Sequence, residues 1–194
     1  REPQALRISG KAVSLAGGVL AGDMQLGDET LQATITLTDV DATKLPVAMP
    51  VAAGNLSADI ELVGTPASPR GDLEIELTNV RPMAVPADTW SPVVFTVRGA
   101  YREGQLTAEA TGQNDAGDRL RAGAELPLQL SLKPFAFQST GDIKGKARVD
   151  AELESFSTVL LPPTHRLAGT ANGEFTISGP PGEPAITGML EVRD

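Results

Sequence analysis

The chain has 194 residues, of which 41% are hydrophobic, so it carries enough apolar surface for one large domain or two small ones. Its net charge is −9 and its 16 lysines and arginines are scattered, which argues against a nucleic-acid partner. The absence of cysteine excludes disulfides and thiolate metal sites. No apolar run approaches the ~18 residues of a spanning helix, so this segment is not expected to span a membrane.

Apolar and polar side chains alternate with a period of two in run after run. Because successive side chains of a strand point to opposite sides, this pattern predicts half-buried strands, whereas an amphipathic helix would repeat near 3.6. About a dozen short strands are expected. Short helical turns are expected only at 40–44 and 155–161. In chain order, the alternating runs are 31–37, 56–62, 73–77, 93–97, 106–110, 126–132, 135–137, 147–153, 175–177 and 189–192.

Proline and glycine lie between these runs, and they predict turns at 64–66, 114–117 and 179–182. Hairpins related by a weak repeat are expected at 45–77 and 161–192. The chain begins without Met and stops after an alternating run. We therefore interpret residues 1–194 as one continuous β-sheet segment of a longer protein.

The alternation predicts an all-β fold whose sheet has one apolar face and one polar, solvent-facing side. An elongated, curled, antiparallel-rich sheet around an apolar groove satisfies this pattern. A closed β-sandwich, in which two apolar faces cover each other, satisfies it as well. A closed core should bind no lipid, whereas an open groove needs lipid, detergent or another chain to fill it.

The residues offer little material for catalysis. His165 is the single histidine, no nucleophile elbow accompanies it, and it is interpreted as a polar loop residue. Asp39 with Asp41, and Asp115 with Asp118, lack the acidic count of a calcium loop and are interpreted as turn residues. We therefore expect no enzymatic activity, no cofactor and no metal.

The stretch from Leu62 to Leu73, Leu-Val-Gly-Thr-Pro-Ala-Ser-Pro-Arg-Gly-Asp-Leu, resembles the recurrent strand, Gly-Thr-x-x-x-Pro, Gly-x-Leu pattern of the AsmA-like family, in particular the C-terminal region of its TamB branch. The second copy, from Gly179 to Leu190, departs from it with Pro180 in place of Thr and two extra residues. The resemblance covers about half of the chain.

This resemblance implies a long curled sheet around an apolar groove in the periplasm of a Gram-negative bacterium. It implies a full-length protein anchored in the inner membrane, an outer-membrane barrel of the TamA type as partner, and roles in phospholipid transport and in outer-membrane biogenesis, including protein assembly. The alternative function is a structural or adhesin-like β domain that covers its own core.

The apolar positions are mostly aliphatic, and such a face suits phospholipid acyl chains held by burial alone, at about 0.8 kcal/mol per methylene. The residues expected to line the groove are Leu31, Ile35, Leu37, Leu56, Ile60, Leu62, Leu73, Ile75, Leu77, Val149, Leu153, Phe175 and Ile177.

Overall fold

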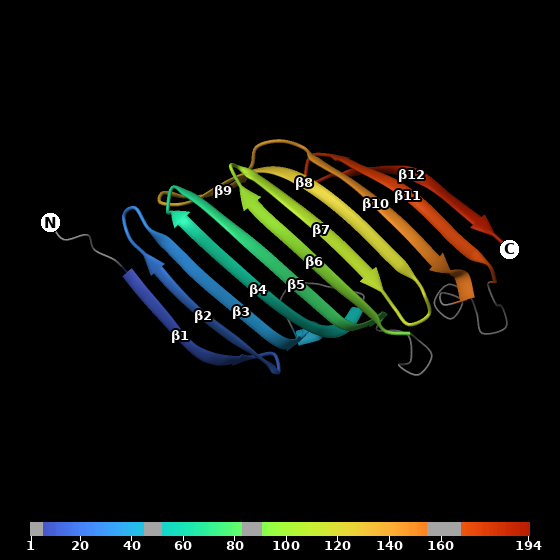
Figure 1. The fold of residues 1–194 in the computed structure, drawn as a ribbon, viewed down its shortest axis with the longest axis horizontal. Helices are drawn as coiled ribbons and strands as arrows, with labels where there is room; N and C mark the ends of the chain where they lie inside the picture. The colour runs from blue at the N-terminus through green and yellow to red at the C-terminus, as the bar shows by residue number, and fades with distance from the viewer. Residues whose placement is uncertain (1–5, 45–51, 83–90, 155–167) are drawn as a thin grey trace.

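The computed structural model describes residues 6–44, 52–82, 91–154 and 168–194. Most of these residues belong to twelve strands, and a single 3-10 turn, η1 (Ala42–Lys44), follows the third strand (Figure 1). The strands are β1 (Leu6–Leu15), β2 (Gly18–Leu26), β3 (Leu31–Asp41), β4 (Ala52–Thr65), β5 (Ser68–Pro82), β6 (Val93–Arg102), β7 (Gln105–Gln113), β8 (Arg119–Leu132), β9 (Phe135–Ser139), β10 (Ile143–Glu152), β11 (Thr170–Gly179) and β12 (Ala185–Arg193).

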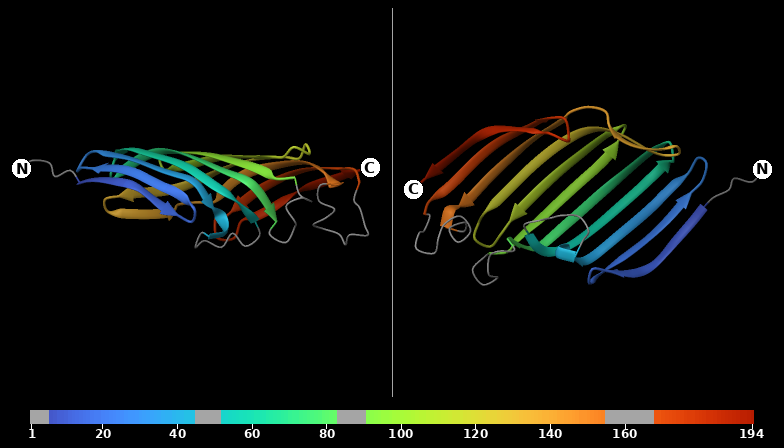
Figure 2. Two further views of the ribbon diagram at one scale, coloured as in Figure 1. Left: turned by 90° about the horizontal axis from the view of Figure 1, so that it is seen from below. Right: turned by 180° about the vertical axis from the view of Figure 1, so that it is seen from behind.

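All twelve strands form one antiparallel sheet that remains open. Strands β1 to β8 pair in chain order and are followed by β10, β11 and β12, while β9 pairs with β8 outside this path. Strands β1 and β12 are therefore the two edges (Figures 1 and 2). The expected curled, elongated sheet is confirmed, and the described residues do not form the alternative closed β-sandwich.

The register of the strands places apolar positions opposite one another across the whole sheet. We call the surface built from these rows the apolar face, and the opposite surface the polar face. One central row contains Gly10, Gly22, Ile35, Ile60, Leu73, Gly99, Ala108, Ala124, Gly145, Ile177 and Ile186. The next contains Val13, Leu20, Leu37, Ala58, Ile75, Val97, Ala110, Ala122, Ala147, Phe175 and Gly188.

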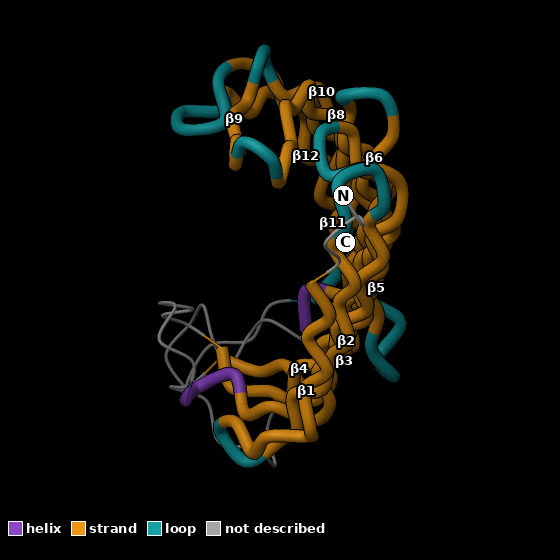
Figure 3. Tube along the Cα trace, turned by 90° about the vertical axis from the view of Figure 1, so that its left-hand side faces the viewer, coloured by secondary structure: helices purple, strands orange, loops and turns teal. Residues whose placement is uncertain are grey.

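The sheet is curved: Figure 3 shows it as an arc, and β9 overhangs the concave side at one end. Bulges interrupt the register of β3 with β4 and of β5 with β6 towards the other end. At these bulges Asp39 and Asn79 adopt positive φ angles of 51° and 55°, which Asp and Asn tolerate better than most residues. The N–H of Asp39 donates to Ser57 Oγ at 3.1 Å. Because bulges increase local twist and bend a strand, these positions account for the curvature.

The described residues form a single layer. Each strand packs on its neighbours in the sheet, with η1 on β4 and the end of β8 on β5 as further contacts. The accessible surface is 13012 Å², compared with about 8,800 Å² for a compact monomer of this mass. Side chains are fully packed only near the ends of the strands. The buried hydrophobic residues are Leu31, Ala33, Val40, Ala42, Tyr101, Leu128 and Ala171.

Several strands are longer or more numerous than the alternation predicted. Strands β4 and β5 have 14 and 15 residues, and β1 and β2 were not expected. The hairpins β4–β5 and β11–β12 occur in the regions of the predicted repeat, although 45–51 and 161–167 lie outside the described residues. The short turn expected at 40–44 is η1. The one expected at 155–161 lies outside the described residues.

Candidate functional site

The candidate site is the middle of the apolar face. In its central rows, side chains of β3, β4 and β5 are half-buried or exposed, and Ile35 retains 41% of its accessible surface. These side chains cover one another laterally through cross-strand pairs such as Ile60 with Leu73. Among the described residues, no second layer packs over them.

The residues predicted to line a groove lie on this one face, with two qualifications. Leu31 is only 3% exposed, so it belongs to the packed end of the sheet and is closed to a ligand. Leu153 follows the last residue of β10, and its N–H donates to the carbonyl of Gly169 at 2.9 Å. The other predicted residues fall into consecutive cross-strand rows on β3, β4, β5, β10 and β11.

Sequence reasoning missed many residues of the same face. The runs at 93–97 and 106–110 were predicted as strands, yet their side chains were not assigned to the lining. The alternation within these runs is the signal that could have identified them. The missed larger side chains include Leu20, Met24, Phe95, Val97, Leu106, Leu120, Leu126, Ile186 and Leu190.

The size of the side chains varies across the apolar face. Its central rows carry only alanine and glycine on β7, β8 and β10, between the larger aliphatic side chains of β3 to β5 and the Phe175 side of β11. A Cβ on Gly112 would lie 2.5 Å from the Phe95 ring, and one on Gly173 would lie 2.7 Å from the Phe175 ring. Both aromatic rings therefore lie directly over a glycine, where no side chain separates the ring from the backbone of the sheet.

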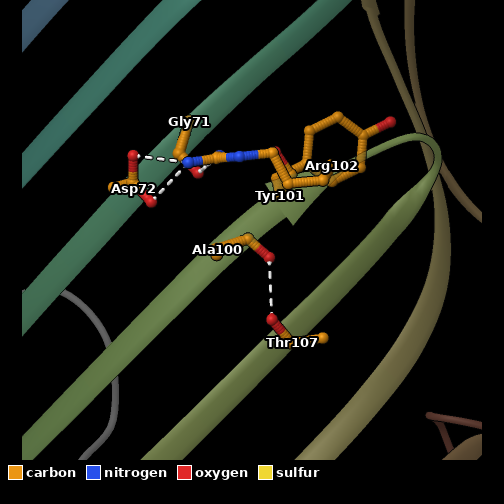
Figure 4. Close-up of polar contacts among 6 residues, drawn as sticks. All are labelled: Gly71, Asp72, Ala100, Tyr101, Arg102 and Thr107. Carbon is orange, nitrogen blue, oxygen red and sulfur yellow. Dashed lines mark hydrogen bonds and ion pairs between the residues drawn. The ribbon is translucent and has the colours of Figure 1, made fainter.

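The polar face carries ion pairs between neighbouring strands. Arg102 bridges β6 and β5, where it bonds both carboxylate oxygens of Asp72 at 2.7 and 2.8 Å and the carbonyl of Gly71 (Figure 4). Arg98 pairs with Glu74 at 2.7 Å on the same two strands. These side chains are largely exposed, so each pair is worth at most about 1 kcal/mol. The pairs mark the polar face as the hydrated one.

A depression of about 990 Å³ against β7, β8, β10, β11 and β12 is a weaker candidate. Its charged lining includes Arg121, Lys146, Arg148 and Glu174, which the register assigns to the polar face. Arg148 lies 3.8 Å from Glu174, so charges of both signs offset each other there. The depression therefore lacks the chemistry of an acyl-chain site.

The described residues provide no metal-binding constellation. They contain no group of three or more His, Cys, Asp or Glu side chains that could hold a metal ion. Asp41 accepts hydrogen bonds from the N–H and Oγ1 of Thr43, and these bonds, together with that of Lys44, lower its pKa. Asp118 accepts from Asn114 Nδ2 at 2.7 Å within the β7–β8 turn. Asp41 acts as a turn residue, and Asp118 does so while also accepting from the N–H of Glu152 in β10 at 2.6 Å. His165 lies outside the described residues.

No family model matches the chain, and neither the curated proteins nor the solved structures searched include a match. Within the described residues, no helix is long and apolar enough to cross a membrane.

Proposed function

We propose that this chain is a non-enzymatic section of a lipid-carrying groove, in which phospholipid acyl chains lie against the middle of the apolar face. The observation that carries the proposal is the distribution of burial. Fully buried hydrophobic side chains occur only towards the ends of the strands, while the central rows, which include Ile35, Ile60 and Ile75, are left partly open.

The chemistry of this face fits a fluid apolar ligand. The central rows of β3, β4 and β5 offer no charged or hydrogen-bonding side chain to fix one orientation. Burial of methylene groups, at about 0.8 kcal/mol each, would supply the binding free energy without directional contacts. From Leu56 to Leu62, strand β4 extends about 20 Å at ~3.3 Å per residue, which exceeds half of a ~30 Å hydrocarbon core. The strand is therefore long enough for a single acyl chain to lie along it on the apolar face.

The resemblance to the TamB branch of the AsmA-like family supplies the biological setting of this proposal. In that setting the segment belongs to a longer protein anchored in the inner membrane. It passes phospholipid through the periplasm towards an outer-membrane barrel of the TamA type and thereby supports outer-membrane biogenesis.

A charge placed on the central rows tests the proposal. Ile75→Asp or Ile60→Asp in the full-length protein would set a carboxylate against acyl chains, where an unpaired charge is strongly disfavoured. Thr111→Asp is the matched control, because Thr111 lies on the polar face beside Arg121. Phospholipid transport between membranes is expected to fall for the two isoleucine variants and to stay unchanged for the control.

Folding of the variants is checked by circular dichroism and by their resistance to proteolysis. Transport at the normal rate by folded Ile75→Asp and Ile60→Asp proteins would contradict the proposal. That outcome would favour the structural or adhesin-like domain instead.

A further inference from the structure

The last five residues of β8, 128–132, leave the main path of the sheet and form a hairpin with β9. Residues 119–127 of β8 pair with β7, and 119–125 also pair with β10, whereas residues 128–132 pair with β9. The change of partner occurs at Pro127, which donates no hydrogen bond to a ladder. We call residues 127–139 the overhanging hairpin, and it lies on the concave side of the sheet (Figures 2 and 3).

Hydrogen bonds to three turns of the main sheet hold the overhanging hairpin in place. The N–H of Leu128 donates to the carbonyl of Gly104 at 2.8 Å, and that of Leu132 donates to the carbonyl of Pro66 at 2.7 Å. Lys133 pairs with Asp28 at 2.7 Å, and this contact lowers the pKa of Asp28. The hairpin therefore spans the β6–β7, β4–β5 and β2–β3 turns.

The hydroxyl of Tyr101 adds a further attachment from the apolar face itself. It donates to the carbonyl of Leu128 and accepts from the N–H of Leu130, each at 3.1 Å. Tyr101 and Leu128 are only 8% and 4% exposed. The junction between the hairpin and the sheet is therefore a packed corner.

Beyond this corner the overhanging hairpin exposes a row of large apolar side chains. Phe135 and Phe137 are 77% and 68% exposed, and they pair in register with Leu132 and Leu130. Alternation along β8 puts these leucines on the same face as Leu126. The apolar face thus continues around the corner onto the hairpin, where nothing among the described residues accounts for the two exposed phenylalanines.

We propose that the overhanging hairpin is a second wall of the lipid site, with Phe135 and Phe137 in direct contact with bound acyl chains. This inference rests on the proposed function. Continuity with the apolar face selects the acyl chain as the occupant, because the face that carries the central rows also carries Leu126 and, beyond the corner, the two phenylalanines. The hairpin then makes the site two-sided at this end and leaves it one-sided along the rest of the sheet.

Site-specific photocrosslinking tests this assignment. Benzoylphenylalanine is introduced singly at Phe137, at Ile75 and at Gln138, whose side chain lies on the opposite face of β9. The full chain is incubated with vesicles of phosphatidylethanolamine and phosphatidylglycerol, irradiated and digested, and lipid adducts are measured by mass spectrometry. Lipid adducts are expected at Phe137 and Ile75, at yields several-fold above that at Gln138.

The pattern of adducts separates the two proposals. Lipid at Ile75 with none at Phe137 would overturn the second wall and leave the proposed function intact. No lipid at either position would overturn both. Lipid at Phe137 alone would show that the hairpin meets the membrane surface rather than the groove, and a crosslinked dimer at Phe137 would assign the phenylalanines to a second copy of the chain. Either of these last outcomes also overturns the second wall.

Discussion

Tyr101→Phe should loosen the overhanging hairpin while the main sheet stays folded. The substitution removes only the hydroxyl that bonds the carbonyl of Leu128 and the N–H of Leu130. Because the junction is buried, the two backbone groups lose their partner where water has little access. We expect the docked hairpin to lose about 1–2 kcal/mol, which makes its open state about 5–30 times more populated.

Amide hydrogen exchange measures this opening directly. The N–H of Leu130 loses its own acceptor in the variant, so faster exchange at Leu130 is expected whether or not the hairpin undocks. Leu132 keeps its acceptor, the carbonyl of Pro66, and its exchange therefore reports undocking of the hairpin. Amides of the central strands β4 and β5 serve as the internal reference. Unchanged exchange at Leu132, or equal acceleration throughout the sheet, would refute the idea that the Tyr101 hydroxyl holds the hairpin on the sheet.

Three further predictions follow from close contacts, charge and the edges of the sheet. Gly112→Ala should lower the free energy of unfolding by about 1–3 kcal/mol because the new Cβ meets the Phe95 ring; Gly182→Ala, in open space, should change it by less than about 0.5 kcal/mol in the same denaturant titration. The ion pair that lowers the pKa of Asp28 stabilises hairpin docking above the ordinary pKa of 3.8, and this stabilisation is lost as pH falls through the lowered pKa. Protection of the Leu132 amide from hydrogen exchange should therefore be constant above about pH 5 and decrease only under more acidic conditions. Asp28→Asn should remove that decrease. All residues of β12 are exposed, and no described strand pairs with its outer edge, so the isolated chain should self-associate in sedimentation experiments. Leu190→Lys should reduce this association more than Thr187→Lys, and a monomeric wild-type chain at high concentration would contradict the idea.

Local alternation was sufficient to predict most strands, because side-chain direction in a strand depends only on the neighbouring residues. It failed at β1, where a register shift between Gly10 and Val13 breaks the period. It also failed at 119–125, where the face-forming positions Ala122 and Ala124 are too small to stand out from their neighbours.

The composition of the candidate site depended on register, which no single run contains. The pairing of Ile35 with Ile60, and of Ile60 with Leu73, turns separate runs into one row. The runs at 126–132 and 135–137 were predicted as strands, yet their departure from the main sheet results from hydrogen bonds to turns as distant as Pro66. The exposure of Phe135 and Phe137 follows from that departure, so the sequence alone carried no signal for it.

If the proposed function is correct, a bound lipid should stabilise the fold, because the middle of the sheet is half-open. Neighbouring strands cover the central side chains only from the side, so much of the burial that a second layer would provide is still available to a ligand. A lipid that binds only the folded chain adds about 2.7 kcal/mol at a free concentration of 100 times its Kd. Thermal unfolding should therefore shift upwards when short-chain phosphatidylcholine is added below its micellar concentration, and the shift should be smaller for Ile75→Asp than for Thr111→Asp. Equal shifts for the two variants would place the lipid elsewhere on the molecule, and no shift in the wild-type chain would mean that the apolar face does not take up acyl chains.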